Sequence, residues 1–271
     1  MVGRIASATA DVRVAVHEFA SQRELRRLRR EALAAPRFAP GEIELSGFRI
    51  RYPDLLSLYM EYKDIFLHRI YDFDSADPRP RVIDGGSYVG MSLLYTKMRH
   101  PGARVTCFEP DPGIRAMLEA NIAANGLTDV DVVPKALGPQ EGVHSFTPDG
   151  ADGGRIVAGA GAFEIPTTPL SGYLAEDVDF LKLNIEAVEL PVLRESRERL
   201  RAVKQMVVEY HGWPDHGQDL GEILTLLDAA GFRYLLNHFD YETNGAVRPP
   251  FRLDRDTRWF ALLYARRDDL L

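Results

Sequence analysis

The feature that most constrains the fold is a repeated alternation of short apolar runs and helix-length segments that begins at residue 81. Each apolar run has the length of a strand, and most are followed by a segment whose apolar residues have helical spacing. Such alternation predicts a mainly parallel sheet with helices on both faces. Five units and a terminal hairpin predict an α/β fold with one doubly wound, seven-stranded sheet rather than two separate halves. The expected strands lie within residues 81–86, 103–110, 129–137, 178–185, 204–212, 232–240 and 257–267.

The segment before this alternation is predicted to be a helical extension. Residues 1–75 have mostly helical spacing, interrupted by one extended piece at 43–52. We therefore predict an N-terminal helical extension or lid at 1–75 and a main domain at 76–271. A Gly-rich insertion at 138–170 is predicted to form a flexible hairpin beside the ligand crevice, or else a plain surface loop.

Charge and composition argue against several classes of protein. The formal net charge of −7 argues against a nucleic-acid-binding protein, which depends on clustered Lys and Arg. The sequence lacks both a signal peptide and a run of 18 apolar residues, so we expect no membrane span. The only cysteine, Cys107, excludes disulfides within the chain and zinc-finger sites, and it favours a reducing cytoplasm. We expect a cytoplasmic protein with a small-molecule partner, and homo-oligomer formation stays open.

A glycine-rich turn, VIDGGSYVG (82–90), follows the first strand of the alternation. Gly85 and Gly86 permit a tight turn, and Gly90 lets the next helix pack close to the strand. The free N–H groups at the helix start offer donors to a carboxylate or phosphate. A dinucleotide fingerprint would have its first glycine where this chain has Asp84. An acid there would repel a pyrophosphate, but it could hold an ammonium group.

A second carboxylate, Glu109, ends the next strand 25 residues after Asp84. At that place it can accept both hydroxyls of a ribose. The two acids together indicate an adenosine joined to an amino acid, which describes S-adenosylmethionine. Two alternatives stay open: a nicotinamide cofactor, against which the missing first glycine counts, and a structural pair of acids that cap helices.

Several motifs, in their order and spacing, resemble the FkbM family of S-adenosylmethionine-dependent methyltransferases. From about residue 43 onward these are EYKDIF (61–66), VIDGGSYVGMSLL (82–94), FEPDPGIRAMLEANIAANGL (108–127), ALG (136–138), FLKLNIEAVELPVL (180–193) and VVEYHG (207–212). The resemblance implies the Rossmann-like class I methyltransferase fold and O-methylation of a small molecule, often in natural product biosynthesis. The cofactor-binding residues that it implies are Asp84, Gly85, Gly86, Ser87, Tyr88, Gly90, Glu109, Pro110, Lys135, Ala136 and Asn184, with Lys135 and Ala136 near the adenine edge.

The fourth expected strand departs from the family pattern. The family usually has K-x-D-x-E-G where this chain has KLNIEA (182–187). Asn184 has the shape of an Asp without its charge, so it is a weaker base and a weaker metal ligand, and we predict no metal. The alternative is a divalent ion held by oxygen ligands, with help from the segment EYHGWPDH (209–216). We expect Lys182 to form a salt bridge with Glu186 or another nearby acid.

The predicted reaction is an in-line displacement of the methyl group from a sulfonium by a substrate oxygen or nitrogen. Asn184 should lie beside the methyl group at the end of its strand. His211 is the preferred general base because an imidazole titrates near neutral pH. Glu186 and Glu209 are the other candidates, and His211 could instead be a structural hydrogen-bonding residue.

Contacts with the acceptor are harder to predict from the sequence. Tyr59, Tyr62 and Phe66 either line a lid over the substrate or pack in the core, and core packing is favoured. The residues of the last loop that could contact the substrate are His238, Asp240 and Asn244, although the same segment also suits a turn. An N- or carboxyl-methyltransferase, a nicotinamide-dependent oxidoreductase and a binding module without catalysis stay open as alternatives.

Overall fold

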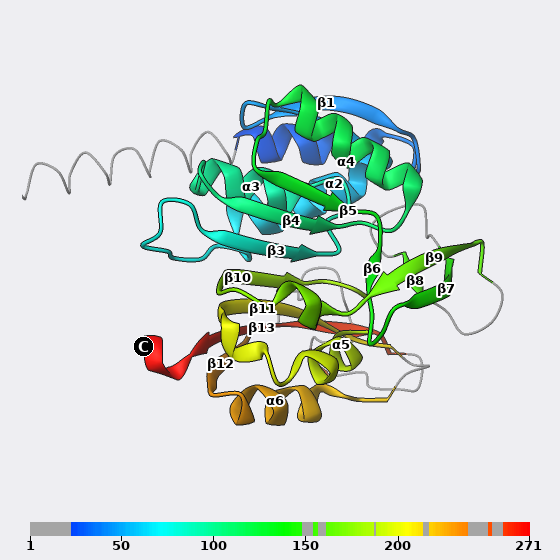
Figure 1. The fold of residues 1–271 in the computed structure, drawn as a ribbon. Helices are drawn as coiled ribbons and strands as arrows, with labels where there is room; N and C mark the ends of the chain where they lie inside the picture. Colours follow the sequence, from blue (N-terminus) through cyan, green and yellow to red (C-terminus); the bar gives the residue numbers. More distant parts are fainter. Residues whose placement is uncertain are drawn as a thin grey trace, which may run out of the picture.

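The computed structural model describes residues 23–147, 154–156, 161–186, 188–213, 217–237, 249–250 and 257–271. Its centre is a seven-stranded sheet in the order β12-β13-β11-β10-β3-β4-β5 (Figure 1). The strands are β3 (Arg81–Gly85), β4 (Arg104–Phe108), β5 (Val130–Val133), β10 (Val178–Leu183), β11 (Val203–Gly212), β12 (Phe232–Asn237) and β13 (Trp259–Arg267). β13 runs antiparallel to β11 and β12, and the other neighbouring pairs are parallel. The predicted mainly parallel, seven-stranded sheet is therefore confirmed.

The connecting helices cover both faces of this sheet (Figure 1). α3 (Met91–Arg99) and α4 (Pro112–Ala124) contribute to one apolar core, and α5 (Glu189–Ser196) and α6 (Leu220–Ala229) to the other. Successive side chains of a strand point to opposite faces, so each strand supplies both cores. Val82 of β3 packs in the first core, and the next residue, Ile83, packs in the second.

The strand order fixes where a ligand can bind. The chain leaves β3 to form β4 on one side, and it later adds β10 on the other side of β3. The crossover helices on the two sides diverge from this point, which leaves a crevice at the carboxyl ends of the strands. The residues that follow β3 and its two neighbours, β4 and β10, therefore lie at this crevice.

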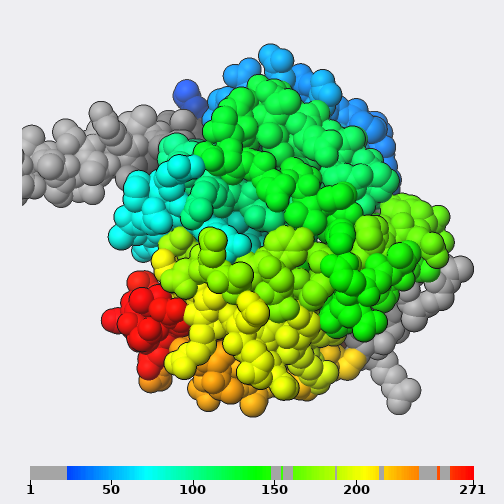
Figure 2. Space-filling model, viewed as in Figure 1, coloured from blue at the N-terminus to red at the C-terminus, as the bar shows by residue number. Residues whose placement is uncertain are grey.

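The N-terminal segment is only partly helical. A helix over residues 23–34 is followed by the hairpin of β1 (Gly41–Leu45) and β2 (Phe48–Tyr52), then by α2 (Leu55–Glu61) and the π-helix η1 (Tyr62–Leu67). The extended piece predicted at 43–52 is this hairpin. The segment packs on the α3–α4 side of the sheet, where its blue surface borders that of the main domain in Figure 2. The proposed boundary near residue 75 stays a prediction.

The insertion builds a second, four-stranded sheet in the order β6-β9-β7-β8. Its strands are β6 (Ala136–Leu137), β7 (Gly142–Thr147), β8 (Arg155–Ile156) and β9 (Phe163–Thr168), and the remaining short 3₁₀ helices are η2 (Leu170–Tyr173), η3 (Leu200–Ala202) and η5 (Asp268–Leu270). β7 and β9 pair antiparallel, as expected for a hairpin in this region. Within the described ranges, no helix combines the length and apolar character needed to cross a bilayer.

Candidate active site

A cavity of about 390 Å³ opens beyond the carboxyl ends of β3, β4, β10 and β11. Its size suits a small-molecule ligand. The predicted site residues among its lining are Gly86, Tyr88, Glu109, Pro110, Ala136, Asn184, Glu186 and Glu209. The predicted residues that are not part of this lining are Asp84, Gly85, Ser87, Gly90, Lys135 and His211. The individual roles of all these residues stay predictions.

The turn after β3 requires glycine at Gly86. This residue has a φ of +78°, and an added Cβ would lie 1.9 Å from the backbone oxygen of Asn184. The same approach lets the backbone N–H of Asn184 donate to the Gly85 oxygen at 3.1 Å. The turn therefore joins the ends of β3 and β10 backbone to backbone, with Gly86 exposed to the cavity.

Asp84 lies beneath this turn and is almost fully buried. Its Oδ1 pairs with the Lys182 ammonium at 3.1 Å, and its Oδ2 accepts a hydrogen bond from the Ser92 hydroxyl. Lys182 also donates to the backbone oxygen of Gly86. The expected salt bridge of Lys182 thus forms with Asp84, and it neutralises a carboxylate that would otherwise be costly to bury.

Glu109, at the end of β4, is held by two backbone donors. Its Oε2 accepts the N–H of Tyr88 and its Oε1 accepts the N–H of Asp111, each at 2.9 Å. Burial raises the pKa of Glu109 to about 7, although both N–H groups act to lower it. The carboxylate lines the cavity with lone pairs to spare, as a group that accepts ribose hydroxyls would need.

A second polar group lies where β10 and β11 end. One carboxylate oxygen of Glu209 accepts hydrogen bonds from the Tyr71 hydroxyl at 2.8 Å and from the Asn184 side-chain amide at 3.3 Å. Burial, followed by the charge of Glu209, holds the pKa of Tyr71 well above its usual range. Tyr71 therefore stays a phenol and acts as a donor. All three residues line the cavity.

His211 lies behind this group among three carboxylates. Its Nε2 lies 3.3 Å from Glu186 and 3.8 Å from Glu209, and its Nδ1 lies 3.4 Å from Glu189. Burial lowers the pKa of His211, but the attraction of Glu186, Glu189 and Glu209 outweighs it and raises the pKa to about 10. At that pKa His211 is mostly protonated at neutral pH, which is unfavourable for a base. Its role as the base stays a prediction.

The cavity has further lining residues that were not predicted from the sequence. They include Glu61, Asp64, Tyr71 and Phe146. Asp64 lies in the π-helix η1, where the N–H of His68 donates to the Lys63 oxygen at 3.0 Å instead of to the i−4 carbonyl. Burial raises the pKa of Asp64 above its ordinary value. The motif EYKDIF contains both acids, Glu61 and Asp64, and it was the only sequence signal for them. Nothing in its spacing shows that this segment reaches the crevice.

The other predicted contacts are placed elsewhere. Tyr62 and Phe66 are buried and stack at 5.0 Å, and Tyr59 packs against the same core, so the favoured core-packing interpretation is confirmed. Lys135 pairs with Glu141 at 3.0 Å outside the cavity lining. Asp215 and His216, the possible metal ligands, lie outside the described residues. The same is true of the possible substrate contacts His238, Asp240 and Asn244.

The described residues contain no group of three or more His, Cys, Asp or Glu side chains arranged to hold a metal ion. The predicted absence of a metal from the reaction stays a prediction. Glu109, which lines the cavity, suits a ligand with hydroxyl groups.

Residues 84–234, more than half of the chain, match the family model described as methyltransferase FkbM domain. The 31-O-demethyl-FK506 methyltransferase FkbM of Streptomyces tacrolimicus is 30% identical over 212 residues, which cover 63% of this chain and 80% of the relative. Methyltransferase sdnD of Sordaria araneosa is 26% identical over 211 residues, with the same coverage of each chain.

Among solved structures, a methyltransferase FkbM from Methylobacillus flagellatus superposes with a TM-score of 0.47 and 16% identity. The match covers 78% of this chain, and this chain spans about half of that protein (54%). The family assignment rests on the match over residues 84–234, which includes the glycine turn, Glu109, the β10 motif and the β11 strand. The chain therefore belongs to the FkbM family of S-adenosylmethionine-dependent methyltransferases.

Proposed function

We propose that this protein transfers the methyl group of S-adenosylmethionine to a hydroxyl of a small molecule. One observation carries the proposal. A single cavity joins the turn at Gly86 and the carboxylate of Glu109 to the Glu209–Asn184–Tyr71 group at the ends of the adjacent strands β10 and β11. A cofactor bound at the first group would present its methyl group toward the second.

The residues present fit the cofactor. Gly86 lines the cavity at the turn after β3, and Glu109 is a buried acceptor facing the same cavity. We assign the ribose hydroxyls to Glu109 and the amino-acid end to the Gly86 turn, beneath which Asp84 is buried in its ion pair with Lys182. When bound, S-adenosylmethionine supplies an electrophilic methyl group, while the protein supplies placement and electrostatics.

The acceptor's proton is proposed to pass to Glu209. This carboxylate lines the cavity, whereas His211 lies outside the lining and is held as a cation. Asn184 and Tyr71 donate to one oxygen of Glu209 and fix its orientation. We assign to His211 the role of holding Glu186 and Glu209 in place. In-line placement of acceptor and methyl group is the larger contribution to rate, and a base adds about 10²–10⁴-fold.

The choice of a hydroxyl acceptor has support from one relative. The name of the S. tacrolimicus protein describes methyl transfer to a 31-O-demethyl compound, which is a hydroxyl acceptor. Family membership also favours methyl transfer over the nicotinamide-dependent alternative. A role in natural product biosynthesis and a cytoplasmic location are parts of the same proposal.

The experiment pairs turnover with cofactor binding. Purified protein is incubated with S-adenosylmethionine and a panel of hydroxyl and amine compounds, and methylated products are detected by mass spectrometry. With an active hydroxyl acceptor, we expect Glu209→Gln to lower kcat by about 10²–10⁴-fold. Its affinity for S-adenosylhomocysteine should stay near that of the wild type, because Glu209 does not hold the cofactor.

Glu186→Gln is the matched control, since Glu186 also lines the cavity and contacts His211. We expect it to lower kcat less than Glu209→Gln does. A larger loss in Glu186→Gln would contradict the assignment of the base to Glu209. Methylation of amines alone would contradict the hydroxyl acceptor.

A further inference from the structure

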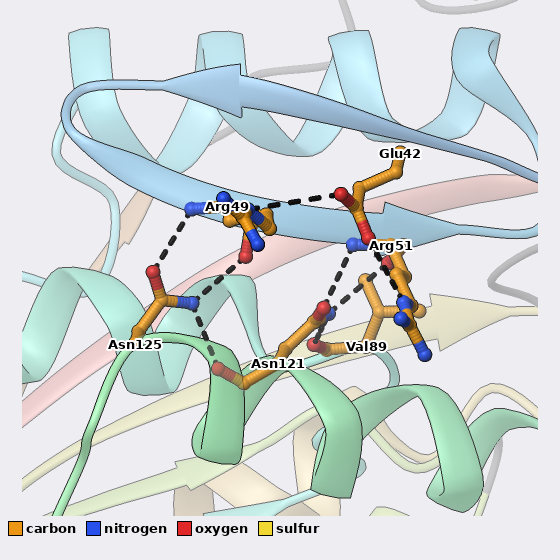
Figure 3. Close-up of polar contacts among 6 residues, drawn as sticks. All are labelled: Glu42, Arg49, Arg51, Val89, Asn121 and Asn125. Atoms are coloured by element: carbon orange, nitrogen blue, oxygen red, sulfur yellow. Dashed lines mark hydrogen bonds and ion pairs between the residues drawn. The ribbon is translucent and has the colours of Figure 1, made fainter.

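Asn121 of α4 and Asn125, the C-cap residue of the same helix, pair with the outer edge of β2 as a neighbouring strand would (Figure 3). Asn121 accepts the N–H of Arg51 at 2.7 Å and donates to the Arg51 oxygen at 3.0 Å. Asn125 does the same with Arg49, at 2.9 and 2.8 Å. Four residues of a helix rise about 6 Å and two residues of a strand about 6.7 Å, so the two spacings match.

Asn121 makes one contact that has no counterpart at Asn125. Its side-chain nitrogen also donates to the backbone oxygen of Val89 at 2.9 Å. The corresponding second donor of Asn125 is used within α4, on the Asn121 oxygen at 2.7 Å. Asn121 is 1% exposed, whereas Asn125 is half-buried. The two residues thus share one function in pairing and differ in a single buried contact.

That contact reaches the cofactor turn. Val89 follows Tyr88, which has a φ of +50° and donates its N–H to Glu109. The second segment that Asn121 contacts contains Arg51, which is two residues before Pro53. Tyr88, Glu109 and Pro53 all line the cavity. One side-chain amide therefore spans two segments that are far apart in the sequence and form different walls of the same cavity.

We propose that Asn121 is a positioning residue of the methyl-transfer site, one that holds the cofactor turn at Val89 and the β2–α2 segment at Arg51 in a fixed relation. That the turn at Val89 binds S-adenosylmethionine rests on family membership. That the β2–α2 segment lies near the acceptor rests on the proposed function. Removing the amide leaves the Val89 oxygen without this partner in a buried place, and both backbone groups of Arg51 without it in a part-buried one. Coupling is reciprocal, so cofactor binding should in turn stabilise the pairing of β2.

The first test compares Asn121→Ala with Asn125→Ala by calorimetric titration with S-adenosylhomocysteine, at a temperature where both variants are folded. We expect Asn121→Ala to weaken binding about tenfold, as the loss of a buried hydrogen-bond partner implies. Asn125→Ala should stay within about twofold of the wild type, even where its Tm falls by a similar amount. Equal weakening in both variants, or wild-type affinity in Asn121→Ala, would overturn the proposal.

A second measurement needs no variant, and it decides the matter if Asn121→Ala does not fold. Hydrogen exchange of the wild-type chain is followed with and without S-adenosylhomocysteine. We expect the ligand to slow exchange at the Arg51 amide as well as in the turn at residues 86–90. Unchanged exchange at Arg51 beside a protected turn would overturn the coupling. Failure to methylate any hydroxyl would overturn the proposed function and not this inference. The titration and the hydrogen-exchange measurement use S-adenosylhomocysteine alone and do not depend on an acceptor.

Discussion

At the scale of single residues, burial and neighbouring charge set the two most informative pKa values of the site. For Glu109 burial is the larger effect, and it raises the pKa to about 7. For His211 burial acts to lower the pKa, and three nearby carboxylates reverse that effect and raise it to about 10. Near neutral pH, Glu109 is therefore close to its midpoint, while His211 carries a fixed positive charge.

The affinity for S-adenosylhomocysteine should rise with pH between pH 6 and 8. The pKa of Glu109 is about 7. At lower pH Glu109 is mostly protonated and is a poorer acceptor for two hydroxyls, and at higher pH the carboxylate predominates. We expect an increase of about tenfold over this range, the ratio of ionised fractions. Calorimetric titration at several pH values measures it. Glu109→Gln should bind weakly with a flat pH profile, and a pH profile in the variant like that of the wild type would contradict the assignment.

The identity of residue 184 also has a physical explanation. The Asn184 amide donates to the Glu209 carboxylate at 3.3 Å. An Asp at this position would set a second carboxylate against Glu209, and the repulsion would raise the pKa of one of them. The Asn of this chain instead orients Glu209 without adding charge. The departure from the family pattern thus matches a hydrogen bond that the structure contains.

Substitution at Gly86 should cost more than backbone strain alone. Gly86→Ala places a Cβ 1.9 Å from the Asn184 oxygen, at a φ of +78°. Gly126→Ala is the control, because Gly126 has a φ of +60° with nothing within 4 Å of the added Cβ. We expect Gly126→Ala to lower the free energy of unfolding by about 1 kcal/mol. Urea unfolding should show a clearly larger loss for Gly86→Ala, with loss of S-adenosylhomocysteine binding; equal losses would contradict the close approach.

At the scale of elements, the turn of the β1–β2 hairpin is determined by local sequence, whereas the π-helix η1 is not. Ser46 and Gly47 both have positive φ, which is the two-residue turn that matches the twist of hairpin strands. That signal is local. The π-helix η1, in contrast, brings Asp64 to the cavity, and no local pattern in EYKDIF distinguishes a π-helix from an α-helix.

The helix over residues 23–34 should contribute to the stability of the whole domain. Leu28 is fully buried in the core that contains α3 and α4, whereas Leu33 of the same helix is 64% exposed. We expect Leu28→Ala to lower the free energy of unfolding by about 2–5 kcal/mol. Leu33→Ala should change it by less than about 0.5 kcal/mol. Urea denaturation followed by circular dichroism measures both, and equal effects would show that the helix does not dock.

At the scale of the whole molecule, the seven-stranded sheet couples the two cores. Neighbouring residues of the same strands, such as Val82 and Ile83, pack in different cores. One core therefore cannot lose its strands while the other keeps them. The cavity lies at the end of these shared strands, so a ligand bound there is linked to the stability of both faces.

S-adenosylhomocysteine should therefore raise the Tm of the entire domain in one transition. At a ligand concentration 100 times the Kd, the stabilisation is about 2.7 kcal/mol. For a domain of this size we expect a shift of about 5–10 °C. Differential scanning calorimetry with increasing ligand measures it. Two separate transitions, of which only one moves, would contradict a single cooperative unit.

The sequence alone determined the sheet, the position of the crevice and much of the cavity lining. Strand–helix alternation depends on side-chain periodicity, which is local, and the carboxyl ends of parallel strands meet at one edge whatever the loops do. This is why Gly86, Glu109, Asn184 and Glu209 could be predicted to lie together.

Only the tertiary structure decided how these groups act on one another. The charge of His211 depends on Glu186, Glu189 and Glu209, which come from the β10–α5 connection, α5 and β11. The reach of Asn121 to Val89 and Arg51 depends on how α4 meets the hairpin. Distances of about 3 Å between segments far apart in the chain set pKa values and hydrogen bonds, and no periodicity encodes those distances.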